Sequence, residues 1–139
     1  MQVFLSYADS DLPLAKRIAQ GLGAAGFQVW YDDLYVFPGD NWGKAVGEAL
    51  EQSEAMVVLL TRDGLRSKKV TSETQFALGN LRYEHRLIPV VSGLDDGAIQ
   101  KHIPWVFRHL TPVYISDEDI ELGLIGIIQA LNQKPAAVE

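Results

Sequence analysis

One glutamate, Glu73, stands in the sequence where a ligand-binding or catalytic carboxylate is expected. It follows the short apolar run 55–60, Ala-Met-Val-Val-Leu-Leu, which predicts a strand buried on both faces. From Val70 to Leu81 the apolar residues recur at helical spacing, and Glu73 falls about 60° from their stripe, on its border. Open α/β sheets bind ligands beyond the carboxyl ends of their strands, where the first turns of such a helix lie. The alternative is a solvated glutamate, which the helix dipole favours near a helix N-terminus.

The sequence lacks the residues that several other kinds of active site require. The sequence has no glycine-rich phosphate loop of either common spacing, and no serine sits in a nucleophile elbow. Its three histidines lack the close spacing of a metal site and there is no cysteine, so we expect no bound metal.

Five strand-like runs alternate with helical patterns along the chain. The strands are expected at 3–5, 27–31, 55–60, 87–91 and 111–115. This alternation predicts an α/β fold: a flavodoxin-like, five-stranded parallel sheet of order 2-1-3-4-5, with helices on both faces. The switch point between the first and third strands would bring residues 6–11, the link 61–67 and Glu73 around one crevice, with the 32–41 loop on its flank.

The same strand order occurs in response-regulator receiver domains, which this sequence does not fit. A receiver needs an acidic pair after its first strand, an aspartate ending the third and a lysine ending the fifth. Asp9 and Asp11 could form the pair, but the third strand ends at Leu60-Thr61 and the fifth at Ile115-Ser116.

Local sequence signals add finer expectations. Ser10 or Asp11 should cap the first helix and Asp40 the second. Pro89 has no amide hydrogen, so it should face away from a neighbouring strand or interrupt the ladder. The apolar run 103–107 should pack on the sheet.

The overall composition favours a single soluble domain. At 139 residues, with 47% hydrophobic and 22% charged residues, the chain is an ordinary globular protein, and its net charge of −6 argues against nucleic acid as the main partner. No run reaches membrane-spanning length and no leader precedes the first strand, so we expect no membrane partner. The lack of cysteine fits a cytoplasmic location. The domain is expected at 1–133, with 134–139 as a tail or the start of a linker.

In their order and spacing, these motifs resemble a TIR (Toll/interleukin-1 receptor) domain of the bacterial type. The resemblance covers roughly residues 2–132 and rests on the first box at 3–7, the second strand and following loop at 29–33 and 37–40, Ser67 and Glu73 after the third strand, and Ile-Pro-Val-Val at 88–91. An Ile-Pro-Val fourth strand is usual in that family, which explains Pro89.

Two activities are known in TIR domains. Some are NAD glycohydrolases or cyclases that cut the bond between nicotinamide and ribose, and others are scaffolds that assemble through TIR–TIR contacts. The enzymes carry a glutamate early in the third helix, preceded by a serine, and Glu73 and Ser67 fall on those positions. Lys69 stands where the enzymes often have a tryptophan. After the first box some members carry arginines, whereas this chain has Ala8-Asp9, so phosphate recognition must use backbone amides or other side chains.

The resemblance therefore implies NAD⁺ as a substrate, with no cofactor. Nicotinamide is already a cationic leaving group, so no general acid is needed, and a carboxylate can stabilise the oxocarbenium-like transition state. We predict that Glu73 is the catalytic residue. Tyrosines at strand ends are often core residues and loop aspartates are often turn formers, so several of the remaining positions have a structural alternative. The expected substrate contacts are Ser6, Tyr7, Tyr31, Asp32, Ser67 and Lys69.

The loop at 32–41 is the expected self-association surface. It places three large apolar residues in succession before a turn signal, an arrangement typical of a partner surface. The alternative is that these side chains fold back onto Trp42 and the core. The residues concerned are Tyr35, Val36, Phe37, Pro38 and Gly39.

The resemblance also implies how such a domain is used. Self-assembly would switch the activity on, with a sensor domain further along the parent chain, in anti-phage defence or signalling. The competing interpretation is a non-enzymatic scaffold that uses the same loop.

Overall fold

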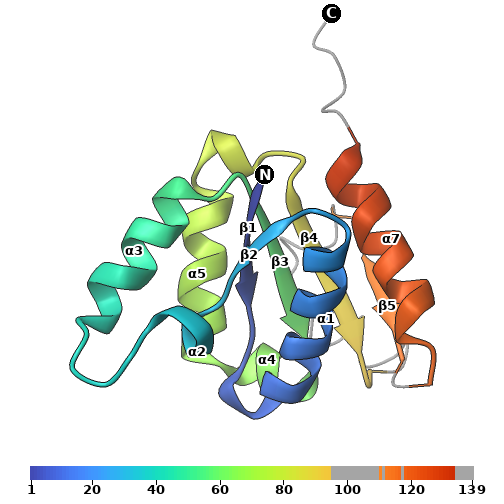
Figure 1. Cartoon of the computed structure of the whole chain (residues 1–139), viewed down its shortest axis with the longest axis horizontal. Helices are drawn as coiled ribbons and strands as arrows, with labels where there is room; N and C mark the ends of the chain where they lie inside the picture. Colours follow the sequence, from blue (N-terminus) through green and yellow to red (C-terminus); the bar gives the residue numbers. More distant parts are fainter. Residues whose placement is uncertain (95–109, 111, 117, 134–139) are drawn as a thin grey trace, which may run out of the picture.

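A parallel sheet with helices on both faces forms the protein, in the order β2-β1-β3-β4-β5 (Figure 1). The computed structural model describes residues 1–94, 110, 112–116 and 118–133. The strands are β1 (Gln2–Ser6), β2 (Gln28–Trp30), β3 (Ala55–Leu60), β4 (Leu87–Ser92) and β5 (Val113–Ile115). The helices are α1 (Leu12–Ala24), α2 (Asp32–Tyr35), α3 (Trp42–Gln52), α4 (Arg62–Arg66), α5 (Lys68–Leu78) and α7 (Ile120–Asn132), with short 3-10 turns η1 (Asp9–Asp11) and η2 (Leu81–Tyr83). The predicted fold class and strand order are confirmed.

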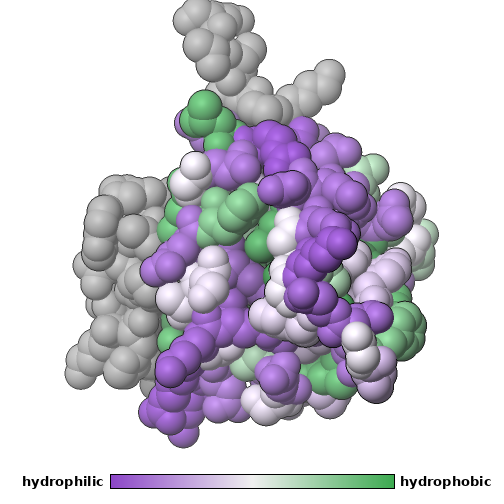
Figure 2. All heavy atoms as spheres, turned by 90° about the vertical axis from the view of Figure 1, so that its left-hand side faces the viewer, coloured by the Kyte–Doolittle hydropathy of each residue, from purple (hydrophilic) through white to green (hydrophobic). Residues whose placement is uncertain are grey.

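The helices cover the sheet in two pairs: α1 and α7 pack on one face, and α3 and α5 on the other (Figure 1). Seen from the α3 side, the surface is mainly hydrophilic, with hydrophobic side chains in separate patches (Figure 2). All six residues of β3 are buried, as expected for a central strand of a parallel sheet.

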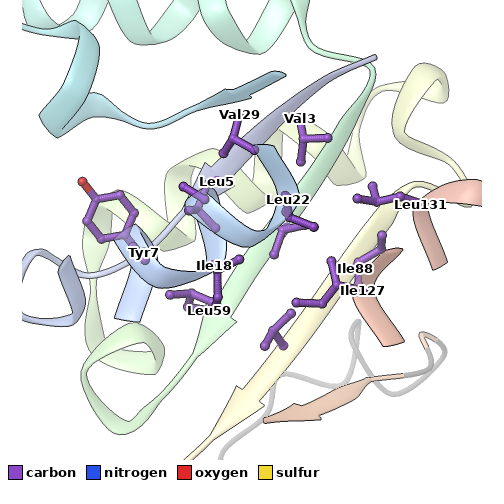
Figure 3. Packing of buried hydrophobic residues seen from close by; sticks show 14 of the residues in the cluster. Val3, Leu5, Tyr7, Ile18, Leu22, Val29, Leu59, Ile88, Ile127 and Leu131 are labelled. Atoms are coloured by element: carbon purple, nitrogen blue, oxygen red, sulfur yellow. The ribbon is translucent and has the colours of Figure 1, made fainter. Parts of the chain in front are cut away.

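Alternate residues of each strand belong to opposite halves of the core. Val57 and Leu59 face the α1–α7 side, where Ile18 and Ile127 pack against them (Figure 3). Met56, Val58 and Leu60 face the α3–α5 side. The pleat thus produces two apolar cores on one sheet and fixes the ends of β1 and β3 side by side.

A glycine and a proline each affect the backbone at one position, and the interruption considered for Pro89 does not occur in the pairing of β4 with β3. Gly26, just past α1, has φ 98°, the left-handed conformation that glycine adopts without strain. β4 runs without interruption through Pro89, which pairs in register with Val58, and the described pairing with β5 begins one residue later, at Val90.

Asp11 occupies the predicted N-cap position of α1, but neither Asp11 nor Asp40 makes the predicted capping hydrogen bond. The alternative cap, Ser10, donates its hydroxyl to Asp63 instead. Asp11 makes no cap bond, because its carboxylate accepts a hydrogen bond from Thr61 Oγ1. Asp40 Oδ2 accepts from the Phe37 amide within the preceding turn, so the neighbouring Asn41 caps α3. At the last helix, α7, the N-cap is Asp119, whose carboxylate accepts a hydrogen bond from the amide of Leu122.

The predicted helix 70–81 is longer than the helix observed. α5 ends at Leu78, and Leu81, assigned to the apolar stripe, lies in η2 with 85% of its surface exposed. α2 and α4 occupy segments expected to be loop. The 103–107 run and the 134–139 tail lie outside the described residues. No helix in the described part of the chain is long and apolar enough to cross a membrane.

Candidate active site

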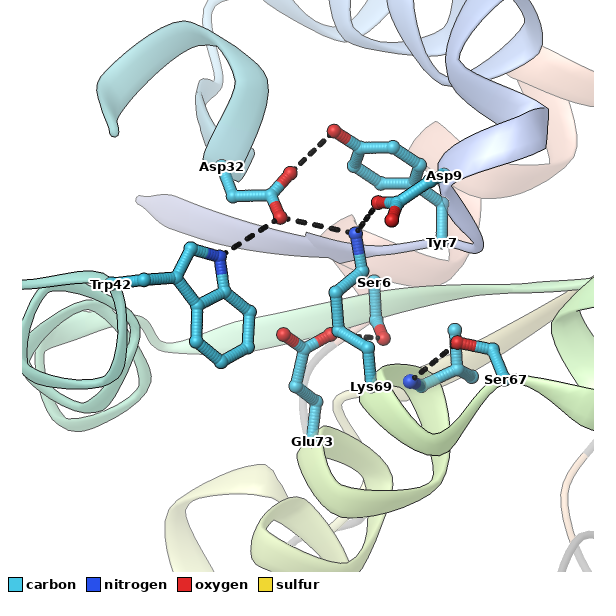
Figure 4. Close-up of polar contacts among 9 residues, drawn as sticks. Ser6, Tyr7, Asp9, Asp32, Trp42, Ser67, Lys69 and Glu73 are labelled. Carbon is cyan, nitrogen blue, oxygen red and sulfur yellow. Dashed lines mark hydrogen bonds and ion pairs between the residues drawn. The ribbon is translucent and has the colours of Figure 1, made fainter. Parts of the chain in front are cut away.

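Glu73 lies in the second turn of α5 and points at the carboxyl end of β1. Ser67 positions the helix by capping it: its hydroxyl oxygen accepts from the amide of Val70 at 3.2 Å. Ser6, the last residue of β1, donates a hydrogen bond from Oγ to Glu73 Oε1 at 2.7 Å (Figure 4). Only 4% of Glu73 is exposed, so the alternative of a solvated glutamate is wrong: the residue is buried next to the apolar stripe of α5.

Burial changes the acidity of this carboxyl group. Removal from water raises the pKa of Glu73 to about 7, while the Ser6 hydrogen bond and the nearby charge of Lys69 favour the ionised form and limit the rise. Near neutral pH, Glu73 is therefore poised between its two protonation states, as is common for carboxylates with a chemical role.

Lys69, one helical turn before Glu73, joins two acidic residues from other elements. Its Nζ lies 2.8 Å from Asp9 Oδ1 and 3.0 Å from Asp32 Oδ2, and 4.2 Å from the centre of the Tyr7 ring (Figure 4). Burial alone would lower the pKa of Lys69, but its bonds to Asp9 and Asp32 outweigh this and raise it. The ammonium is thus fixed in its charged form.

Asp32, at the start of α2, collects donors from three directions. Tyr7 donates its hydroxyl to Oδ1 at 2.5 Å, and Trp42 Nε1 donates to Oδ2 at 3.4 Å, beside Lys69. Burial alone would raise the pKa of Asp32, yet these donors lower it. Burial and the bond to Asp32 raise the pKa of Tyr7 far above its ordinary value, so Tyr7 stays a neutral donor.

An open cavity of about 260 Å³ lies next to this cluster. Asp32 and Tyr7 contribute to its wall, whereas Glu73 does not. Figure 4 shows the stem of Lys69 running past the Glu73 carboxylate toward Asp9 and Asp32. The lining residues are Tyr7, Asp9, Leu12, Asp32, Asp33, Val36 and Trp42.

Four of the six predicted substrate contacts gather around Glu73: Ser6, Tyr7, Asp32 and Lys69. The other two stand back from it. Ser67 uses its hydroxyl as the α5 cap, and Tyr31 packs edge-on against Tyr7 with ring centres 6.4 Å apart.

Sequence reasoning missed two members of the site, Asp9 and Trp42. Asp9 carries a usable signal, since it is an acidic residue three positions after the first strand. Trp42 is exposed at the first residue of α3, and its Nε1 donates to Asp32. Only the chain path that brings α3 beside α2 reveals it.

The predicted self-association residues behave differently from one another. Tyr35 folds back, stacking on Trp30 with ring centres 5.9 Å apart, rather than on Trp42. Val36 lines the cavity, and Phe37 is 62% exposed. Pro38 and Gly39 form the turn after it, where Gly39 has φ 94°.

Within the described residues, no group of three or more histidine, aspartate or glutamate side chains is placed to hold a metal ion. The described site offers a buried carboxylate beside a cation, with hydroxyl donors and an aromatic wall. Such a group can stabilise a positive charge that develops on a bound molecule.

Comparisons with known proteins identify the family of this chain. A family model described as the TIR domain matches residues 3–125. The chain is 26% identical over 136 residues to the probable 2′ cyclic ADP-D-ribose synthase TcpO of Methanobrevibacter olleyae, a match that covers 95% of this chain and 39% of TcpO. It is 35% identical over 60 residues to the NAD(+) hydrolase PdTIR of Paracoccus denitrificans, covering 42% of this chain and 20% of that protein. The chain thus spans well under half the length of both relatives.

The fold is also that of a solved TIR protein. The TIR-STING receptor of C. gigas superposes with a TM-score of 0.78 and 24% identity, over 94% of this chain and 39% of the receptor. With the family match across most of the chain and the same sheet order, the conclusion follows that this chain belongs to the TIR domain family.

Proposed function

We propose that this domain cleaves the bond between nicotinamide and ribose in NAD⁺, with Glu73 as its catalytic residue. The observation that carries the proposal is the Glu73 carboxylate, buried at the switch point of the sheet and oriented by Ser6. The names of two relatives, an NAD(+) hydrolase and a probable cyclic ADP-ribose synthase, support NAD⁺ as the substrate.

The proposed reaction needs one carboxylate and no general acid. When the bond from the ribose carbon to the ring nitrogen breaks, its electron pair leaves with nicotinamide, which departs as a neutral molecule. The ribose carbon is left electron-poor, and the Glu73 carboxylate stabilises this charge and can accept hydrogen bonds from the ribose hydroxyls. Water then adds and releases a proton, giving ADP-ribose. Attack by a hydroxyl of the same molecule would instead give a cyclic product.

The direct experiment follows nicotinamide release from NAD⁺ by the purified chain. We expect slow release by the isolated domain and none by Glu73→Ala. Chromatography of the products separates linear from cyclic ADP-ribose. Absence of release at any protein concentration, including after artificial clustering, would contradict the proposal.

We further propose that assembly of several copies activates the domain. Three exposed hydrophobic residues in one stretch of the chain, Leu34, Phe37 and Trp42, support this proposal. The same residues favour the second candidate function, a scaffold that works through TIR–TIR contacts without chemistry. Glu73→Ala separates the two, because it should abolish NAD⁺ cleavage and leave self-association intact.

A sensor elsewhere in a longer parent chain would supply the trigger, in anti-phage defence or signalling. The match to only 39% of TcpO and of the TIR-STING receptor supports a modular arrangement of this kind. Sequencing the natural reading frame and expressing the whole protein tests it.

A further inference from the structure

The ammonium of Lys69 is bonded to two residues of the cavity wall, Asp9 and Asp32. The Lys69 side chain rises from α5, passes Glu73 and Ser6, and ends between Asp9 and Asp32 (Figure 4). The cavity wall includes both of these aspartates but not Glu73, which is almost fully buried. A molecule seated in this cavity therefore does not touch Glu73, and moving the Lys69 side chain away from the two aspartates would open space beside the Glu73 carboxylate (Figure 4).

The two partners of Lys69 hold it unequally, so the ammonium can be released. The Asp9 side chain is 93% exposed, and an ion pair with so exposed a carboxylate is weak and screened by salt. The Asp32 side chain is only 14% exposed, but it also accepts from Tyr7 and Trp42. Departure of Lys69 would therefore leave Asp32 with two donors, and a flexible four-carbon stem allows the movement.

The charge of the cavity suggests what draws Lys69 away. Three aspartates, Asp9, Asp32 and Asp33, line it, and Glu73 adds a fourth carboxylate nearby. Such a wall suits a cationic ring, and a phosphate can approach it only by pairing with a cation there. Lys69 is paired with Asp9 and Asp32, whereas the half-exposed Lys16 lies 3.8 Å from Asp33. Lysine binds phosphate as a compact point charge.

We propose that Lys69 is a specificity-determining residue that selects substrates carrying a phosphate group. While paired with Asp9 and Asp32 it closes the route to Glu73, and it opens that route when a phosphate of the substrate takes its ammonium. The inference rests on the proposed NAD⁺ cleavage and names the part of the dinucleotide that triggers opening: the diphosphate.

The test compares two substrates with the same scissile bond, NAD⁺ and nicotinamide riboside, which lacks phosphate. Lys69→Met keeps the length of the stem and removes the charge. Its matched control is Lys68→Met, which makes the same change at the exposed neighbour on the same helix. In Lys69→Met we expect the KM for NAD⁺ to rise by roughly tenfold or more with kcat little changed. For nicotinamide riboside kcat/KM should rise, because the barrier is gone.

Two further variants distinguish selection of phosphate-bearing substrates by Lys69 from a purely structural role of this residue. Lys69→Arg should retain the preference for NAD⁺, and Lys68→Met should match the wild type on both substrates. If Lys69→Met lowers kcat/KM for the two substrates by the same factor, Lys69 only supports the fold and the inference is wrong.

Calorimetric titration with pyrophosphate separates this inference from the proposed function. If Lys69→Met weakens pyrophosphate binding and Lys68→Met does not, phosphate selection is supported. This holds even if no variant releases nicotinamide, and in that case only the proposed reaction is wrong. Equal affinity of both variants and the wild type for pyrophosphate overturns the role of Lys69, whatever the NAD⁺ assay shows.

Discussion

The carboxyl group of Glu73 is nearly inaccessible to water, yet the proposed chemistry needs it ionised. In the unfolded chain it titrates near its ordinary value of 4.5, and in the folded protein near 7. Because the folded-state pKa lies above the unfolded-state pKa, the folded protein binds the proton more tightly. The stability that this provides is complete below pH 4.5 and is lost as the pH rises through 7.

Replacing Glu73 by glutamine should therefore stabilise the protein in a pH-dependent way. Glutamine keeps an acceptor for Ser6 but cannot ionise, so it avoids a penalty of about 3 kcal/mol above pH 7, from the difference between the two pKa values. We expect the melting temperature of Glu73→Gln to exceed that of the wild type by several degrees at pH 8 and to equal it at pH 4. Equal melting temperatures at both pH values would contradict the burial of an ionised Glu73.

Sequence spacing located Glu73 near the site but not its burial. Helical periodicity places a residue on a face of its own helix, and it carries no information about what lies opposite. Burial here comes from β1, whose Ser6 is 67 positions away, and from the path of Lys69 between two aspartates. Asp9 was missed as a partner of Lys69 for the same reason.

At the scale of elements, the short helix α2 and the turn after it set the composition of one surface. α2 directs Asp32 into the site, while the stack of Phe4, Trp30 and Tyr35 anchors the other end of the helix to the core. Phe37, two residues beyond Tyr35, is left exposed. The sequence indicated an apolar partner surface here, but one of its three aromatic or aliphatic residues proved to be an anchor and one a cavity wall.

Phe37→Asp should weaken self-association without unfolding the domain. An exposed side chain contributes little to folding, so we expect a change in the free energy of unfolding within about 0.5 kcal/mol. At high protein concentration, the sedimentation coefficient and the specific NADase activity should both be lower than in the wild type. The matched control is Leu81→Asp, an equally polar change at an exposed residue of η2, which precedes β4 and so lies at the opposite edge of the sheet from the site. A loss of more than about 10 °C in the melting temperature of Phe37→Asp would show that Phe37 is a core residue.

Helices and strands with a clear hydrophobic pattern could be predicted from the sequence, and the shortest helices could not. The apolar run of β3 and the apolar stripe of α1 predicted their structures because burial follows directly from their composition. The four-residue α2 and five-residue α4 carry too few residues for a periodic signal. Their formation depends on tertiary contacts, such as the cap that Thr61 provides for α4.

At the scale of the whole molecule, the cavity of the single domain is small. Its volume of about 260 Å³ is below the 300–1,000 Å³ typical of ligand pockets, and Glu73 does not line it. A neighbouring copy that contacts the 32–41 segment would enlarge the wall of this cavity, since Asp32, Asp33 and Val36 belong to both.

Specific activity should therefore increase with protein concentration. We expect nicotinamide release per molecule to rise from dilute to concentrated protein and to rise further when the domain is fused to a dimerising or clustering partner. A specific activity that stays constant across this range would mean that one domain holds a complete site.

The central claim, that the Glu73 carboxylate performs the chemistry, is tested most directly by the rate of nicotinamide release from NAD⁺ by clustered Glu73→Gln. Glutamine preserves the size of the side chain and an acceptor for Ser6, and it removes only the charge. Glu48→Gln, the same change at an exposed glutamate of α3, is the control. The account predicts a loss of at least about 100-fold for Glu73→Gln, with wild-type rates for the control. Release by Glu73→Gln within a few-fold of the wild type would contradict it.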